Sequence, residues 1–256
     1  MPLEIAMFPL LSDNFGYLVR DTASGRVASI DAGEESAIVA ELDKRGWTLT
    51  DIFVTHHHPD HTDAIAPLKR RFPDVKVTGP SLESGKIAGL DTLVSGGDTV
   101  KLGETEFAVI DVPGHTLGHI AYFSADAAAL FSADALFSLG VGRMFEGDAE
   151  GMWKGLVRLK ALPGETRIYC GHEYTLSNAK FALSVDPDNA ALKARAEEVQ
   201  RQLDAGEATI PALLSDELAA NPFLRADDPE LAKSMDLAGA PAWQVFGALR
   251  KAKDNF

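Results

Sequence analysis

The chain has 256 residues, of which 46% are hydrophobic and 24% are charged, so it can bury a full core, which argues against a disordered or fibrous protein. Its N-terminus shows no basic stretch before an apolar run, and no apolar segment approaches the roughly 20 residues of a membrane helix. The net charge of −14 disfavours binding to phosphate backbones, and a single cysteine rules out an internal disulfide. We therefore expect a cytoplasmic protein with no membrane, nucleic-acid or obligate protein partner.

The first two-thirds of the chain alternates short β-rich runs with helical patterns. The runs predict strands over Gly16–Arg20, Val27–Asp31, Asp51–Thr55, Glu106–Val112, Ile120–Phe123, Ala129–Ser132 and Arg167–Cys170. Apolar residues at helical spacing predict helices over Ser36–Arg45, Asp63–Phe72 and Asp148–Leu162. This alternation predicts a layered α/β domain.

From Tyr174 onward the predicted strands stop and the pattern becomes helical. Helices are predicted over Leu176–Val185, Ala190–Leu203, Asp216–Ala220 and Ala242–Lys253, with turns rich in Pro, Asp or Asn between them. We therefore predict a boundary near Tyr174, between a layered α/β domain over residues 1–173 and a helical domain over residues 174–256.

The histidines are clustered rather than scattered. The chain has 7, and they fall in three places: His56, His57, His58 and His61, then His115 and His119, then His172. The first group, T-H-H-H-P-D-H, directly follows a predicted strand. Because side chains alternate in an extended chain, His56 and His58 can share a metal ion while His57 faces away.

The other candidate ligands each follow a predicted strand and a small residue, where the site of an α/β protein is usually found. His56, His58 and His115 can form one three-nitrogen metal site. Asp60, His61 and His172 can form a second, and the two carboxylate oxygens of Asp134 can bridge the two. The alternative is a polar loop with hydrogen-bonded structural residues, and it explains this spacing poorly because metal sites need such nitrogen and oxygen sets.

Other polar residues of these motifs are expected to have different roles. His57 and His119 should support the ligands or the fold rather than bind metal, since ligands need partners for their second nitrogen. Asp31 could be such a partner, or a turn residue before Gly33, and the sequence leaves both open. Cys170 ends an apolar run and is expected to be buried and inert.

Four motifs together resemble the metallo-β-lactamase superfamily: T-H-H-H-P-D-H, P-G-H-T-L-G-H (113–119), S-A-D (132–134) and C-G-H-E-Y (170–174). Within that superfamily the chain closely resembles the hydroxyacylglutathione hydrolases, or glyoxalase II. The resemblance runs nearly end to end, from L-S-D-N-F-G-Y-L (11–18) to N-P-F-L-R (221–225). It implies an αββα sandwich as the catalytic domain (residues 1–173), followed by an all-α C-terminal domain that binds the substrate (residues 174–256).

The resemblance also implies an activity. The expected reaction is hydrolysis of S-D-lactoylglutathione to glutathione and D-lactate, the second step of methylglyoxal detoxification. It implies two divalent metal ions, with zinc expected and iron or manganese compatible with the same ligands. The expected nucleophile is a metal-bound hydroxide, so no further catalytic side chain is required, and the thiolate can leave without a strong general acid.

Five residues match positions where the family holds glutathione: Arg143, Phe145, Tyr174, Arg250 and Lys253. Without the resemblance, Arg250 and Lys253 would be interpreted as a solvated helix face and Tyr174 as a core residue. With it, Arg250 and Lys253 lie three residues apart on one helical face and can bind carboxylates as a pair of cations.

The chain departs from the family pattern near these positions. Ala133 and Ala135 stand where the family usually has Gly and Thr, and Arg143 and Phe145 stand where Lys and Tyr are common. The cation is retained at Arg143, while a hydroxyl is lost at Phe145, which would affect affinity or acyl preference. Two other functions remain as alternatives: a glutathione persulfide dioxygenase with a single iron, and a nonenzymatic relative that binds metal or glutathione.

Overall fold

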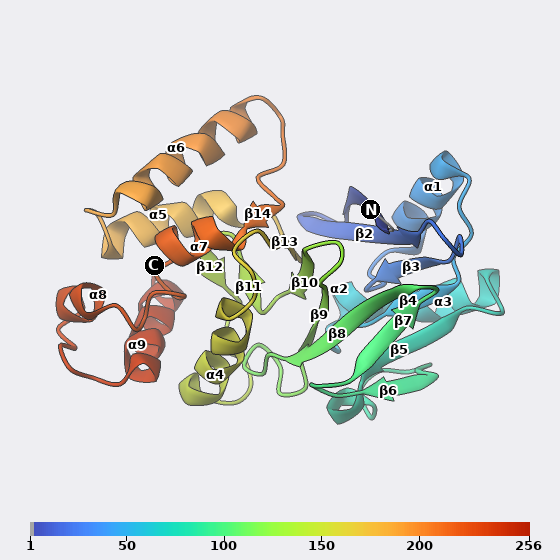
Figure 1. The fold of residues 1–256 in the computed structure, drawn as a ribbon, viewed down its shortest axis with the longest axis horizontal. Helices are drawn as coiled ribbons and strands as arrows, with labels where there is room; N and C mark the ends of the chain where they lie inside the picture. The colour runs from blue at the N-terminus through green and yellow to red at the C-terminus, as the bar shows by residue number, and fades with distance from the viewer. Residues whose placement is uncertain (1–2) are drawn as a thin grey trace. The chain divides into compact units, whose positions relative to one another are not determined.

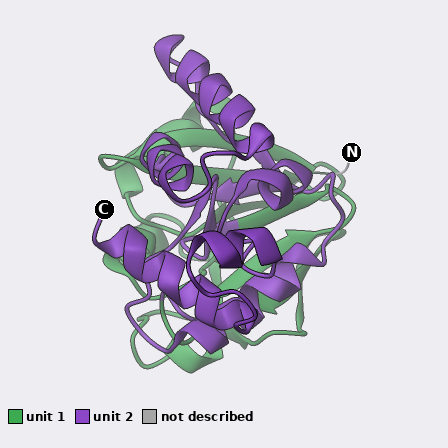
Figure 2. Ribbon diagram, turned by 90° about the vertical axis from the view of Figure 1, so that its left-hand side faces the viewer, with its two compact units in different colours: residues 1–111, 116–131 green, residues 112–115, 132–256 purple. Residues whose placement is uncertain are grey.

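The computed structural model describes residues 3–256, and the chain divides into two compact units (Figure 2). The first unit comprises the residues up to Asp111 together with 116–131, and the second comprises 112–115 and 132–256. Within residues 3–256 no helix is long and apolar enough to cross a membrane.

The first unit contains a six-stranded sheet in chain order (Figure 1). Its strands are β1 (Leu3–Leu10), β2 (Asn14–Asp21), β3 (Val27–Ile30), β4 (Asp51–Phe53), β5 (Lys76–Pro80) and β6 (Thr92–Val94). The first three strands pair antiparallel, and β3 to β6 pair in parallel. Parallel neighbours need crossover connections, and these contain α1 (Glu35–Arg45), α2 (Pro59–Thr62), α3 (Ile65–Arg71) and the short 3₁₀ helix η1 (Ser81–Glu83).

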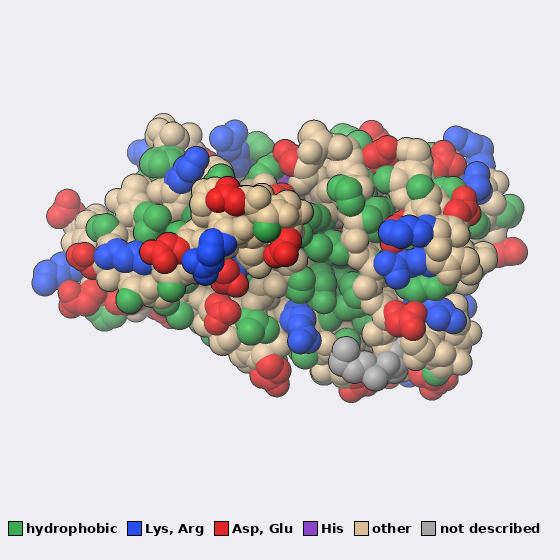
Figure 3. Space-filling model, turned by 90° about the horizontal axis from the view of Figure 1, so that it is seen from above, with side chains coloured by type: hydrophobic (Ala, Val, Ile, Leu, Met, Phe, Trp, Pro, Cys, Tyr) green, Lys and Arg blue, Asp and Glu red, His purple; other side chains and the backbone are tan. Residues whose placement is uncertain are grey.

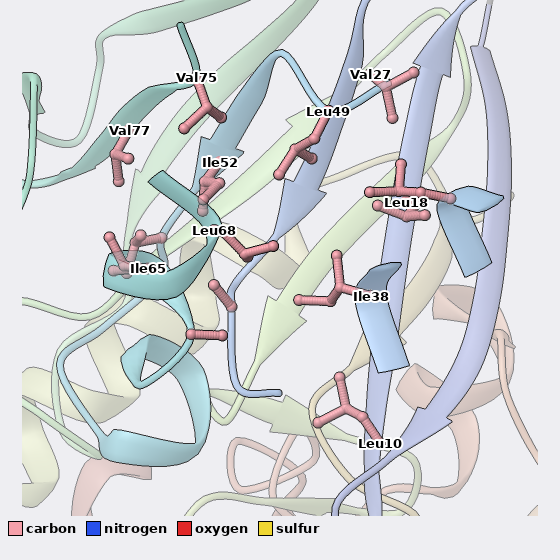
Figure 4. Close-up of a cluster of buried hydrophobic side chains, with 14 of the residues drawn as sticks. Leu10, Leu18, Val27, Ile38, Leu49, Ile52, Ile65, Leu68, Val75 and Val77 are labelled. Carbon is pink, nitrogen blue, oxygen red and sulfur yellow. The ribbon is translucent and has the colours of Figure 1, made fainter. Parts of the chain in front are cut away.

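Apolar side chains pack between this sheet and the helices α1 and α3 (Figure 4). Ile38 of α1 and Leu68 of α3 contribute to the same cluster as Ile52 of β4, and each is at most 1% exposed. Burying a side chain of this size stabilises the fold by about 1.5–3 kcal/mol. This core fixes the strand ends from which the first group of histidines begins.

A second sheet begins in the same unit with β7 (Thr99–Leu102), β8 (Thr105–Asp111), β9 (Ile120–Ser124) and β10 (Ala129–Ala133), paired antiparallel in that order. Its inner face meets the first sheet, since the ring of Phe53 lies 5.6 Å from Phe107 and 5.5 Å from Tyr122. The Tyr122 hydroxyl donates a hydrogen bond to the Val54 carbonyl at 2.9 Å. The two sheets therefore form a sandwich.

The second unit carries two short antiparallel strand pairs, β11 (Leu136–Phe137) with β12 (Gly140–Val141), and β13 (Arg167–Cys170) with β14 (Ala212–Leu213). Its helices are α4 (Ala149–Lys160), α5 (Thr175–Val185), α6 (Ala190–Asp204), α7 (Leu214–Ala220), α8 (Pro229–Ser234) and α9 (Ala242–Asp254). Trp153 of α4 packs against Phe246 of α9, with ring centroids 6.1 Å apart.

All predicted strands and helices are present, but β1, β5, β6, β7, β11, β12 and α8 were not predicted. Two expectations also differ from the structure. The prediction that strands stop at Tyr174 is wrong, because β14 pairs with β13; a two-residue strand is too short to produce a periodic pattern. The helix predicted from Asp63 begins at Ile65, behind the separate turn of α2. The proposed domain boundary near residue 174 stays a prediction.

Charged side chains of both signs are interspersed over the face drawn in Figure 3. The excess of 38 acidic over 24 basic residues is therefore not gathered into one acidic patch on that face.

Candidate metal centre and substrate-binding residues

The first group of candidate ligands follows β4. The chain from Val54 to His58 is outside regular structure, and the Nε2 atom of His56 lies 3.1 Å from the Nδ1 atom of His58. Pro59 then starts helix α2, which places Asp60 and His61 in one helical turn. Ligand atoms of His56 and His58, of His56 and His61, and of Asp60 and His61 lie within 4.8 Å of each other.

Asp31 supports this group from the end of β3. Its carboxylate accepts hydrogen bonds from the Thr55 backbone N–H at 2.7 Å and from Nδ1 of His61 at 2.8 Å. Its backbone also has a φ of 59°, a left-handed conformation that Asp tolerates better than most residues. Both roles left open by the sequence therefore apply: Asp31 turns the chain and also orients His61.

His57 and His119 occupy different surroundings. Nδ1 of His57 lies 3.0 Å from an oxygen of Glu83. The ring of His119 stacks on His56, with centroids 4.5 Å apart and planes at 17°. His57 thus contacts Glu83, and His119 contacts the candidate ligand His56. Among residues 3–256, neither His57 nor His119 belongs to a group of residues suited to hold a metal ion.

The second unit brings together the other three candidate ligands. His115 follows β8, Asp134 directly follows β10, and His172 follows β13. One oxygen of Asp134 lies 3.3 Å from Nε2 of His115 and 3.4 Å from Nε2 of His172. The Gly171 N–H donates to the Ala133 carbonyl at 3.0 Å, so the chain segments that carry Asp134 and His172 are directly joined.

The orientation of His115 depends on the loop after β12. Its Nδ1 lies 2.9 Å from the Arg143 carbonyl oxygen; because a carbonyl can only accept, Nδ1 carries the proton. The loop approaches closely at Gly142, where a Cβ atom would lie 1.9 Å from the Asp134 carbonyl oxygen. A side chain at position 142 would therefore displace either this loop or Asp134.

These arrangements fit a divalent metal ion. With Nδ1 of His61 and of His115 protonated, the Nε2 atom of each neutral ring presents a lone pair. Nε2 of His61 lies 3.3 Å from a carboxylate oxygen of Asp60, and Nε2 of His115 lies 3.3 Å from a carboxylate oxygen of Asp134. Two acceptors so close repel each other unless a cation or a second proton lies between them. Imidazole and carboxylate together suit zinc, iron or manganese.

Three of the predicted glutathione-binding residues are exposed and lie near His115 or His172. The Phe145 ring is 60% exposed and stands edge-on to His115, with centroids 5.3 Å apart. The Arg143 guanidinium lies 5.8 Å from that ring. Tyr174, which is 38% exposed, stacks on His172 at 4.7 Å and 7°.

Arg250 and Lys253 differ from each other although both lie on α9. Arg250 is 6% exposed and donates to the Val141 carbonyl and to Asp254 at 2.9 and 3.0 Å. Burial lowers its pKa, while Asp254 acts in the opposite direction. Lys253 is half-buried and donates to the Ser177 carbonyl at 3.0 Å. Arg250 therefore lacks the exposed surface expected of a free cation, whereas Lys253 retains part of it.

Cys170 lies next to this group but has no reactive character. It is fully buried at the end of β13, and burial raises the pKa of its thiol to about 12. A thiol with this pKa is not a nucleophile at neutral pH.

Family comparisons cover almost the whole chain. Residues 14–172 match the model of the metallo-beta-lactamase superfamily, and residues 173–256 match that of the hydroxyacylglutathione hydrolase C-terminus. The chain belongs to the hydroxyacylglutathione hydrolase family. It is 52% identical to the hydroxyacylglutathione hydrolase of Rhodopseudomonas palustris strain HaA2 and 53% identical to that of Bradyrhizobium sp. strain ORS 278, with 100% of each chain covered.

Solved structures show the same fold. ETHE1 from Myxococcus xanthus has a TM-score of 0.69 at 25% identity, over 98% of this chain and 90% of that one. The di-iron-bound form of TTHA1623 has a TM-score of 0.56 at 30% identity, over 66% of this chain and 91% of that one. The metallo-β-lactamase fold with a helical C-terminal part is thus confirmed, and the family with its His and Asp sets makes this chain a divalent-metal-binding protein.

Some residues that shape the site were missed by sequence reasoning. Glu83 and Asp254 contact candidate residues, but neither lies within one of the motifs named above. Gly142 directly precedes the candidate residue Arg143, yet its close approach to Asp134 depends on tertiary packing.

Proposed function

We propose that this enzyme hydrolyses S-D-lactoylglutathione to glutathione and D-lactate at a centre of two divalent metal ions. His56, His58 and His115 would hold one ion, Asp60, His61 and His172 the other, and Asp134 would bridge them. The observation that carries the proposal is the position of one Asp134 oxygen, 3.3 and 3.4 Å from Nε2 of His115 and of His172, which are assigned to different ions.

The ligand environment supports this assignment. His61 and His115 each give their Nδ1 proton to an oxygen acceptor, Asp31 in one case and the Arg143 carbonyl in the other. These bonds hold the rings in the tautomer that a metal ligand needs. A relative of the same fold was solved in a di-iron-bound form, and its metal count agrees with two ions here; zinc is the metal we expect.

Bound metal ions would activate water at neutral pH and polarise the thioester carbonyl. Arg143, Tyr174 and Lys253 would then hold the tripeptide, with Phe145 beside His115 as an apolar contact. Arg250 would contribute by fixing the loop after β12. No side chain needs to protonate the leaving thiolate, because a thiol is acidic enough to leave as the anion.

The test combines metal analysis with kinetics. The purified wild type should contain two metal ions per chain when saturated and should release free thiol from S-D-lactoylglutathione. Asp134→Ala should abolish turnover while circular dichroism shows an intact fold, whereas His57→Ala at saturating metal should still bind two ions. Activity of Asp134→Ala above a few per cent at full metal content would contradict the bridging role.

A further inference from the structure

The carboxylate of Glu83 is buried and fully engaged. Glu83, the last residue of η1, is 1% exposed. One of its oxygens accepts a hydrogen bond from the Gly118 N–H at 3.0 Å, and the other lies 3.0 Å from Nδ1 of His57. Because an ionised carboxylate only accepts, His57 carries its proton on Nδ1.

These two partners belong to the two loops of the first unit that meet at His56. His57 lies between His56 and His58. Gly118 precedes His119, whose ring stacks on His56. The Ile120 N–H, at the start of β9, donates to the Thr55 carbonyl at 3.0 Å. This backbone hydrogen bond connects the two loops at one end, and Glu83 connects them near His57 through its bonds to His57 and Gly118.

The fit between Glu83 and the second loop is close. A Cβ atom at position 118 would lie 2.5 Å from Cγ of Glu83 and 2.9 Å from Cβ of Leu82. No side chain fits there unless Glu83 moves. The close approach of this loop to Glu83 therefore depends on glycine at position 118.

We propose that Glu83 is a positioning residue for the metal centre, which fastens the His56–His58 segment to the Gly118–His119 segment and so preorganises His56 and His58 as ligands. The inference rests on the proposed metal centre. Glu83 touches neither metal nor substrate; its effect would pass through His57 and Gly118. Without it, metal binding would have to order the histidine loop at the expense of affinity.

The experiment measures metal affinity by competition with a chromophoric zinc chelator, using the full chain stripped of metal. Glu83→Ala should raise the apparent Kd for zinc by about 10–100-fold, while two ions still bind at saturation. Glu83→Gln should raise it less, since its amide can accept from Gly118 and donate to the other tautomer of His57. The matched control is Glu41→Ala, which removes another buried carboxylate of the same unit, one that pairs with Lys44 and Arg45 within α1.

Two further variants approach the contact from its other side. His57→Ala should weaken zinc binding, and adding it to Glu83→Ala should cost less than the product of the two separate effects, because both remove the same hydrogen bond. Gly118→Ala should weaken zinc binding by displacing Glu83, and it remains informative if Glu83→Ala does not fold. A zinc Kd within twofold of the wild type in Glu83→Ala or Gly118→Ala, or an equal loss in Glu41→Ala, would overturn the proposal. A wild type that binds fewer than two ions would instead overturn the proposed function.

Discussion

The imidazole Nδ1 of His115 lies 2.9 Å from the backbone carbonyl oxygen of Arg143. Arg143 therefore contributes through two different groups. Its carbonyl accepts from a candidate metal ligand, and its side chain, which pairs with Asp254 at 3.4 Å, is still 58% exposed and can meet an anionic substrate. Changing the side chain leaves the carbonyl in place. Metal binding and substrate binding can accordingly be separated at this position.

Arg143→Ala and Lys253→Ala should each raise KM for S-D-lactoylglutathione by about tenfold, corresponding to roughly 1.4 kcal/mol for a partly exposed charged contact. Metal content and kcat should change little, because neither side chain reaches a candidate ligand. Steady-state kinetics checks this. A small thioester without the tripeptide is the control, and equal losses on both substrates would show that these cations support the fold instead.

Arg250→Ala should behave differently because Arg250 is buried. Its loss would leave the Val141 carbonyl without this donor and free the loop that carries the Arg143 carbonyl. We expect a loss of about 1–3 kcal/mol in the free energy of unfolding and a fall in kcat as well as a rise in KM. Urea unfolding and kinetics measure the two effects. A variant that keeps wild-type stability and changes KM alone would identify Arg250 as a direct substrate ligand.

Asp21 should make stability depend on pH in the acid range. Burial alone would raise its pKa, but hydrogen bonds from the Ser24 side chain and from the Glu104 and Ala23 N–H groups outweigh burial and lower the pKa from 3.8 to about 2. Since the folded pKa is below the unfolded one, ionised Asp21 contributes stability above about pH 4, which is lost as pH falls towards 2. Asp21→Asn should cost about 1–3 kcal/mol at pH 7 and progressively less below pH 4.

This comparison uses urea unfolding of the metal-free protein, so that loss of metal at low pH does not contribute. Asp188→Asn, which changes an exposed carboxylate, is the matched control and should shift stability little at any of these pH values. A difference between Asp21→Asn and the wild type that stays constant from pH 7 to pH 2 would refute the role of ionised Asp21.

Ala133 has a φ of 41° directly before Asp134, a left-handed conformation that costs a residue with a Cβ atom about 1–2 kcal/mol. Ala133→Gly should remove this strain, at the expense of greater flexibility in the unfolded chain. The net gain should be about 0.5–1 kcal/mol, measured by thermal unfolding. Ala135→Gly, two residues along the same loop, should give no such gain.

The sequence predicted the parts of the site that depend on local pattern. His56, His115 and Asp134 each follow a β-rich run, and the end of such a run is visible without knowledge of the fold. The φ of Ala133 also agrees with the glycine usual at this position in the family. Such strand ends are visible in the one-dimensional pattern, so the positions of these residues along the chain could be predicted from it.

Burial and long-range contacts could not be predicted in the same way. Arg250 looked like an exposed cation because the spacing within α9 does not reveal the Val141 carbonyl, which lies 109 residues away in the chain. Glu83 contacts Gly118 across 35 residues, and a lone glutamate between Leu82 and Ser84 carries no signal. Such residues become visible only when packing brings separate loops together.

The burial of Cys170 has a further consequence for the proposed reaction, whose product is a thiol. Every turnover of that reaction would release glutathione beside the protein, and an exposed, ionisable cysteine would exchange with the oxidised form of that product to give a mixed disulfide. Cys170 is fully buried with a pKa of about 12, and the chain has 1 cysteine in all. The folded enzyme thus offers no thiolate for this exchange, and its activity should be insensitive to the ratio of reduced to oxidised glutathione around it.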